Sequence, residues 1–197
     1  ADAIALAHSA ADAPSQAEVM ANLRIAKRRA ALAIALADIA GIWPLEEVTR
    51  ALTEFADACV KGVLRYLLRE AAEKATLSAG DGAVLEATTG LAVLAMGKYG
   101  AFELNYSSDI DLNVFYDKDS SALPYGAEPA PIFVRMTQRL VKLLQERTGD
   151  GYVFRTDLRL RPDPASTAIA ISTAAALSYY ESVGQNWERA AMIKTRA

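Results

Sequence analysis

The chain has 197 residues and a formal net charge of −3, with 52% hydrophobic and 23% charged residues. This composition excludes a mainly disordered chain, and the mild acidity argues against a dedicated nucleic-acid-binding protein, which usually carries a basic surplus. The most apolar run, residues 30–37, is far shorter than the roughly 20 residues that a membrane-spanning helix needs. The single cysteine, Cys59, cannot form an internal disulfide, which favours a reducing, cytoplasmic compartment.

The start and the end of the sequence bear on whether it is a whole protein. No basic segment followed by an apolar run stands at the N-terminus, so we expect no signal peptide. The sequence does not begin with Met and stops directly after an expected helix, so we expect a fragment of a longer protein.

The first 80 residues predict a helical layer. Ser15 and Glu18 form a capping pattern at the start of residues 16–40, a run that holds no helix breaker before Gly41. Apolar residues at helical spacing predict a second long helix over residues 44–76.

After an expected turn at residues 80–82, the pattern becomes mixed. Apolar runs predict strands at residues 91–96 and 110–116, and alternation predicts a third at 152–160. The remaining expected elements are a loop at 120–131, a loop from 161, and helices at 132–148, 173–183 and 186–196. The sequence therefore predicts an α+β fold, with a helical region at residues 1–82 and a core with a small mixed sheet at 83–197, truncated at its C-terminal end.

Two aspartates stand at the start of the expected second strand. Because side chains alternate between the faces of a strand, Asp109 and Asp111 should share one face while Ile110 and Leu112 point into the core. Neighbouring carboxylates repel each other unless a cation lies between them, and hard oxygen ligands of this kind suit Mg²⁺, which also takes phosphate oxygens. The alternative is a surface turn, where Asp-x-Asp is common.

The expected third strand shows a related pattern. Alternation places Asp157, Arg159 and Arg161 on one face. Leu158 and Leu160 occupy the other, apolar face. One carboxylate beside two guanidiniums fits a metal ligand next to phosphate-binding residues. An edge strand with a solvated outer face would show the same alternation.

Other residues that could carry chemistry argue against three classes of site: a P-loop, a Ser-His-Asp triad and a zinc site. Gly97-Lys98 forms a glycine turn after the first expected strand, but the chain lacks the Gly-x-x-x-x-Gly-Lys-Ser/Thr pattern of a P-loop. The only histidine, His8, lies in an Ala-rich stretch, which argues against a Ser-His-Asp hydrolase, and no His/Cys spacing suits zinc. Cys59 lies on an apolar helical stripe and is expected in the core. The glycine turn, Asp-x-Asp and third aspartate together favour catalysis more than any one alone.

Three longer strings carry a family resemblance: GKYGAFELNYSSDIDL at residues 97–112, FRTDLRLRPD at 154–163 and YYESVGQNWERAAMIKTR at 179–196. The glycine turn, the Asp-x-Asp and the later aspartate resemble the nucleotidyltransferase superfamily that includes DNA polymerase beta. The full strings resemble the glutamine synthetase adenylyltransferase family (glutamate–ammonia-ligase adenylyltransferase). The resemblance extends over about residues 91–197.

The resemblance implies a polymerase-beta-like domain of a bifunctional enzyme that regulates nitrogen assimilation. In this family one half attaches AMP from ATP to a tyrosine of glutamine synthetase. The other half removes the AMP with inorganic phosphate and releases ADP. The implied partners are glutamine synthetase, the regulatory protein PII, nucleotide and phosphate. Asn186-Trp187-Glu188-Arg189 resembles the adenylyl-removing half, because the other half typically has WTWEHQAL there.

The resemblance also assigns site residues. The family's three metal-binding catalytic carboxylates match Asp109, Asp111 and Asp157, which implies Mg²⁺ as cofactor. Its turn residues around the nucleotide phosphates match Gly97, Lys98, Ser107 and Ser108. The assignment of Arg159 and Arg161 to phosphate is our inference from the strand face.

Two other functions stay open at this stage. One is a non-catalytic module that docks glutamine synthetase or PII, which nucleotide-binding calorimetry with and without Mg²⁺ would distinguish. The other is the adenylylating half or a small-molecule nucleotidyltransferase, which would incorporate AMP rather than release it. We expect no nucleic-acid partner and no membrane partner.

Overall fold

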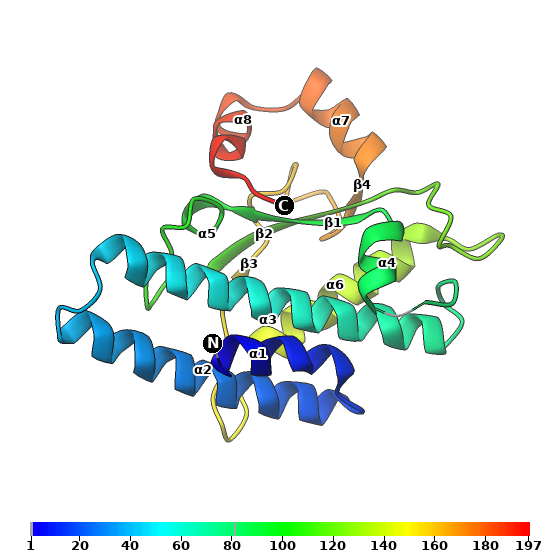
Figure 1. The fold of residues 1–197 in the computed structure, drawn as a ribbon. Coiled ribbons are helices and arrows are strands. Elements are labelled where there is room, and N and C mark those ends of the chain that lie inside the picture. Colours follow the sequence, from blue (N-terminus) through cyan, green and yellow to red (C-terminus); the bar gives the residue numbers. More distant parts are fainter. Residues whose placement is uncertain (1, 81) are drawn as a thin grey trace.

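Helices cover both faces of a small mixed sheet in the computed structural model, which describes residues 2–80 and 82–197 (Figure 1). The α+β class expected from the sequence is confirmed. In chain order the elements are α1 (Asp2–His8), the 3₁₀ helix η1 (Ser9–Asp12), α2 (Gln16–Ile39), α3 (Leu45–Glu73), α4 (Gly82–Thr88), β1 (Leu91–Met96), α5 (Gly97–Gly100), β2 (Ile110–Tyr116), α6 (Pro129–Gln145), β3 (Thr156–Asp157), β4 (Ile171–Ser172), α7 (Thr173–Ser182), α8 (Asn186–Ala191) and the 3₁₀ helix η2 (Met192–Lys194).

The two long N-terminal helices form a hairpin beneath the sheet (Figure 1). The Ser15 Oγ accepts a hydrogen bond from the Glu18 backbone N–H, which fixes the start of α2 as the sequence predicts. The second helix, α3, ends at Glu73, three residues before the expected end. Buried residues of this hairpin and of the sheet belong to one continuous hydrophobic cluster that includes Cys59 and Leu112. The boundary at residue 82 stays a prediction.

The sheet is built around β2. On one side β1 pairs with it antiparallel over six residue pairs, from Leu91–Tyr116 to Met96–Asp111. On the other side lie two short parallel strands, with β3 at the start of β2 and β4 at its end. The strands expected at residues 91–96 and 110–116 are confirmed.

The expected strand over residues 152–160 is wrong, because only Thr156–Asp157 pairs with β2. The Asp157 Oδ1 accepts a hydrogen bond of 2.8 Å from the backbone N–H of Arg159, so the chain turns away from the sheet directly after Asp157. The short β4 and α4 were not expected. Part of the expected turn at residues 80–82, Asp81, lies outside the described residues.

Helix α6 (Pro129–Gln145) starts and ends three residues earlier than the helix expected at residues 132–148. It begins at Pro129, because proline suits the first turn of a helix rather than only a loop. It ends at Gln145, where the guanidinium of Arg24 on α2 donates to the carbonyls of Leu143 and Glu146. This arginine is buried, with 1% of its surface exposed.

The C-terminal helices α7 and α8 lie on the opposite face of the sheet from α3 (Figure 1). Helix α7 matches the expectation, whereas α8 is shorter and continues as η2. The buried carboxylate of Glu188 joins the two helices, since it accepts hydrogen bonds from the Tyr179 hydroxyl at 2.9 and 3.0 Å and from the Gln185 backbone N–H at 2.7 Å. No helix among the described residues has the length and apolar character to cross a membrane.

Candidate functional site

Three aspartates meet where β1 ends and β2 and β3 begin. The pairing register places Asp111 opposite both Met96 of β1 and Asp157 of β3. Asp109 lies two residues before Asp111, at the entry to β2. The sheet therefore brings the three predicted carboxylates to one end of β2, although the expected third strand is only two residues long.

The glycine turn after β1 contacts this cluster. Gly97 has φ +56°, a left-handed backbone that favours glycine, and a Cβ there would lie 3.0 Å from the Asp111 Oδ2. Lys98 follows it and is exposed. The expected glycine turn is the start of the four-residue helix α5, and the binding of nucleotide phosphates by Gly97 and Lys98 stays a prediction.

The carboxylates influence each other electrostatically. Burial raises the pKa of the Asp111 carboxyl above its ordinary value, and the charges of Asp157 and Asp109 raise it further. Arg159 and Lys98 act in the opposite direction. Asp111 is thus the central carboxylate, exposed to repulsion from both neighbours, and it has two cations within electrostatic range.

Arginines hold the two outer carboxylates. Arg159 donates from Nε to the Asp157 Oδ2 at 2.8 Å, and this hydrogen bond keeps the pKa of Asp157 below its ordinary value. The Arg155 Nε donates to the Asp109 carboxylate, and its Nη2 donates to the Ser107 carbonyl at 2.9 Å. The sequence prediction missed Arg155, although it stands two residues before Asp157 and extends the same charged alternation.

Arg161 does not share the face of Asp157 and Arg159, so that expectation is wrong. Its guanidinium donates to four backbone carbonyls of the loop that follows β3, namely those of Leu158, Pro164, Thr167 and Ala168. The turn at Asp157 breaks the alternation on which the shared face was based. Arg161 therefore orders this loop.

The two serines before Asp109 lie in a tight turn. The Ser108 hydroxyl donates to the Asn105 Oδ1 at 2.8 Å, and the Ser107 backbone N–H donates to the same oxygen at 3.1 Å. The Ser107 hydroxyl has no hydrogen-bond partner among the described residues. Of the two serine hydroxyls, that of Ser107 is therefore the one available to a ligand.

In the described part of the chain, the three aspartates have the chemical type, but not the arrangement, of a site for a hard divalent cation. Three carboxylates at one end of a strand are the oxygen ligands that Mg²⁺ prefers, and their mutual repulsion favours a cation among them. Within residues 2–80 and 82–197 no group of three or more His, Cys, Asp or Glu side chains is arranged to hold a metal ion, and two of the carboxylates face arginines instead. The side chains of Arg155 and Arg159 are 59% and 83% exposed, so both have room to turn into solvent.

An α+β domain with a glycine turn and three carboxylates at one end of a mixed sheet is consistent with the nucleotidyltransferase class. A family model described as glutamate-ammonia ligase adenylyltransferase (GlnE) matches residues 1–197. The chain belongs to this family.

Curated relatives carry a name that also includes an adenylyl-removing enzyme. The chain is 61% identical over 181 residues to the "Bifunctional glutamine synthetase adenylyltransferase/adenylyl-removing enzyme" of Bradyrhizobium sp. (strain ORS 278), covering 92% of the chain and 18% of that protein. It is 58% identical over 193 residues to the protein of that name from Rhodopseudomonas palustris (strain HaA2), covering 98% and 20%. The chain thus spans about a fifth of the length of these relatives.

Proposed function

We propose that this chain carries the adenylyl-removing site of its family, which cleaves tyrosyl-AMP on glutamine synthetase with inorganic phosphate and releases ADP. The observation that carries the proposal is the position of Asp111, opposite Asp157 in the sheet, two residues from Asp109 and next to the space that a Cβ on Gly97 would fill. The names of the relatives support glutamine synthetase as substrate. The choice of half rests on Asn186-Trp187-Glu188-Arg189, which resembles the removing half.

The reaction exchanges one phosphoester bond for another. A phosphate oxygen attacks the α-phosphorus of the tyrosyl-AMP ester and forms a P–O–P bond, while the bond to the tyrosine oxygen breaks. The products are ADP and the free tyrosine, whose oxygen takes up a proton. Since phosphate is already anionic, the reaction needs no strong general base, and the main difficulty is the accumulation of negative charge.

Residues of this chain would counter the negative charge that accumulates on the phosphates. Asp109, Asp111 and Asp157 would hold Mg²⁺, which when bound neutralises phosphate charge. Lys98 and Arg159 are exposed cations within electrostatic range of Asp111 and would attract the phosphates. Glycine at position 97 allows the backbone to approach the carboxylates closely. We also include Mg²⁺ dependence, PII as a regulatory partner and a cytoplasmic location in the proposal.

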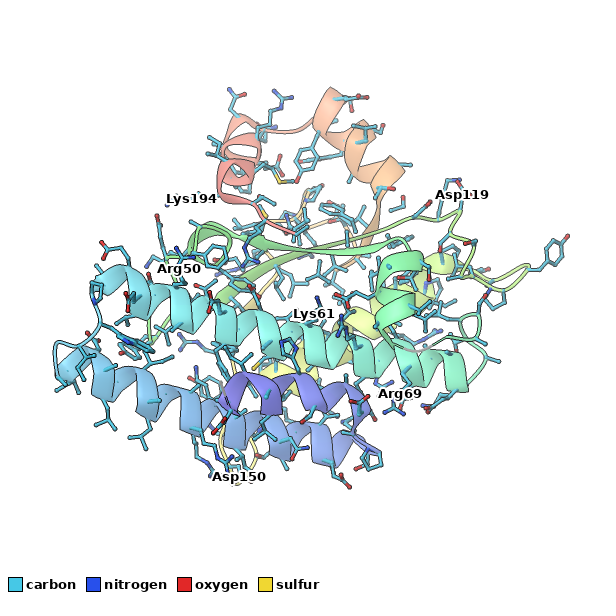
Figure 2. All side chains as sticks on the ribbon, viewed as in Figure 1. Arg50, Lys61, Arg69, Asp119, Asp150 and Lys194 are labelled. Carbon is cyan, nitrogen blue, oxygen red and sulfur yellow. The ribbon has the colours of Figure 1, made fainter. Side chains whose placement is uncertain are left out.

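The decisive experiment compares Asp109→Asn with Asp150→Asn. Each variant removes an exposed aspartate paired with an arginine, Arg155 or Arg28, but Asp150 lies far below the sheet (Figure 2). Asp109→Asn should reduce release of ADP from adenylylated glutamine synthetase by about 100-fold or more. Asp150→Asn should retain the parental rate, and both melting temperatures should stay close to the parent, because exposed pairs stabilise little.

The same assay distinguishes the alternatives. Equal rates for the two variants would contradict the assigned site. Incorporation of AMP from ATP without phosphate-dependent release would identify the adenylylating half. Absence of both activities, with glutamine synthetase still bound, would identify a docking module.

A further inference from the structure

A small cavity lies between α2 and the two loops that precede β2 and β3. It has a volume of about 80 Å³, and its lining includes Lys27, Ser107, Tyr152, Phe154 and Arg155. None of its lining residues is acidic. The cavity is far smaller than the roughly 300–1,000 Å³ of sites for drug-sized ligands, so it suits a group of only a few heavy atoms.

Lys27 and Arg155 are the two cationic side chains that line this cavity, and Lys27 is the one without a carboxylate partner among the described residues. Its Nζ lies 4.1 Å from the ring centroid of Phe154 and 5.9 Å from that of Phe55. In the part of the chain that the structure describes, its ammonium has no carboxylate or hydrogen-bond acceptor as partner. Burial lowers the pKa of Lys27, and the nearby Cys59 acts in the opposite direction.

The neighbouring basic residues of α2 differ from Lys27 in this respect. Arg24 donates to backbone carbonyls of α6 and of the following loop, including Gly151 at 2.9 Å. Arg28 pairs with Asp150 at 2.9 Å. Lys27 is therefore a partly buried cation that contacts aromatic rings and, among the described residues, is paired with no carboxylate, an arrangement that leaves room for an anion.

Further donors surround the same space. The Arg155 Nε and Nη2 are engaged by Asp109 and by the Ser107 carbonyl, whereas its Nη1 has no hydrogen-bond partner among the described residues. The Ser107 hydroxyl is free in the same sense. Through Arg155 the cavity is joined directly to Asp109, so an anion held there would lie beside the three-carboxylate site.

We propose that this cavity binds a phosphate group, with Lys27 as its principal cation and Ser107 and Arg155 as additional donors. The group is either free inorganic phosphate or the terminal phosphate of a nucleotide. The choice of phosphate among small oxyanions rests on the proposed function. The contribution of Lys27 means that the helical N-terminal region takes part in ligand binding, beyond its packing beneath the sheet.

The proposal can be tested by titrating the 197-residue chain with inorganic phosphate and following backbone amide signals by NMR. The signals of Ser107, Ser108, Tyr152 and Phe154 should shift saturably, while adenosine should leave them unchanged. Lys27→Met keeps an unbranched stem on the Phe154 ring but removes the charge. It should raise the dissociation constant about tenfold or more. Lys27→Arg should restore binding to within about threefold of the parent.

The matched control is Arg29→Met, which removes one exposed positive charge from the same helix outside the cavity. It should bind phosphate like the parent. Equal weakening by Arg29→Met and Lys27→Met, unchanged binding in Lys27→Met with a parental melting temperature, or the absence of any saturable shift would each overturn the proposal.

Two further arms identify the source of the phosphate. Saturation by inorganic phosphate without competition from ADP assigns the cavity to free phosphate. Displacement of phosphate by ADP, with the same amides shifted, assigns the cavity to the phosphate that becomes the terminal phosphate of ADP in the proposed reaction. Because binding is measured without turnover, this result is independent of the Asp109→Asn assay, and either proposal can fail without the other.

Discussion

The position that a Cβ on Gly97 would occupy borders the carboxylate of Asp111, since such a Cβ would lie 3.0 Å from the Asp111 Oδ2. Two constraints therefore coincide at Gly97: a left-handed backbone with φ +56°, and a carboxylate at the close limit of the distances that a Cβ tolerates. This carboxylate is also the one whose pKa both neighbouring aspartates raise. A side chain at position 97 would therefore push on the central carboxylate of the site.

We predict that Gly97→Ala lowers both stability and activity. The left-handed backbone conformation should cost about 1–2 kcal/mol for alanine, and the methyl group should move the Asp111 carboxylate and reduce ADP release at least about tenfold. Gly126→Ala is the matched control, because Gly126 has φ +75° but nothing within 4 Å of the position that an alanine methyl group would occupy. Urea denaturation should give similar losses of stability for the two variants. Equal activities would contradict the role assigned to the contact.

Arg159 and Arg161 should have separable effects. Arg159→Met removes an 83%-exposed side chain that contacts Asp157, so it should reduce ADP release and leave the melting temperature nearly unchanged. Arg161→Met removes a guanidinium that binds four carbonyls of one loop, and it should destabilise the protein by about 2 kcal/mol.

Thermal denaturation and subtilisin digestion would distinguish these outcomes. Faster cleavage within residues 158–168 is expected for Arg161→Met alone. If Arg161→Met instead raised the apparent KM for phosphate without any loss of stability, the structural role assigned to Arg161 would be wrong.

The predictable parts of the fold were those fixed by local pattern. The capped start of α2 and the apolar runs of β1 and β2 depend on neighbouring residues, so the sequence alone places them. The face that Asp109 and Asp111 are expected to share was inferred from alternation and stays a prediction, because Asp109 lies one residue before β2. The prediction of a strand at residues 152–160 was wrong because the same alternation of charged residues and leucine also fits a turn. In this turn the Asp157 side chain accepts a hydrogen bond from the Arg159 backbone N–H.

The parts that were missed depend on distant contacts. Strand β4 has two residues and exists through its pairing with Phe115 and Tyr116. Lys27 and Arg24 stand in a helix rich in alanine and basic residues, where charged side chains are expected at the surface. The structure alone shows that the Arg24 side chain on α2 binds carbonyls at the C-terminal end of α6. It also shows that Lys27 lines a cavity beside the loop that precedes β3.

Asn113 should position the segment that follows Asp157. This fully buried side chain lies two residues beyond Asp111 on the same face of β2, and its Nδ2 donates to the Leu160 carbonyl at 3.1 Å. Its Oδ1 has no hydrogen-bond partner among the residues that the structure describes. Asn113→Leu removes both the bond and the unpartnered oxygen, so stability should change by about 1 kcal/mol or less.

Activity should respond more strongly than stability to this change. Without the Asn113 amide, the segment from Asp157 to Leu160 loses a contact to β2, and we expect ADP release to fall about tenfold or more. Asn113→Asp places a carboxylate in the same buried space and should destabilise the fold by about 3–5 kcal/mol. Full activity in Asn113→Leu, measured beside its urea denaturation, would remove Asn113 from the positioning role.

The last prediction concerns the ion pair between Glu70 on α3 and Arg139 on α6, whose side chains are 18% and 35% exposed. The hydrogen bond from Arg139 lowers the pKa of Glu70, with a further contribution from Lys74. A carboxyl whose pKa is lower in the folded state stabilises the fold above its unfolded pKa, about 4.3, and this stabilisation is lost as the pH falls through the folded value.

Glu70→Gln should therefore reduce the free energy of unfolding by about 1 kcal/mol at pH 7, and the difference from the parent should shrink steadily below about pH 4.3. Glu73→Gln removes the exposed pair with Arg69 and should have less than half of this effect at pH 7. Urea denaturation of the parent and both variants between pH 7 and pH 3 tests this, and a Glu70→Gln difference that stayed constant down to pH 3 would show that the charge of Glu70 does not stabilise the contact between α3 and α6.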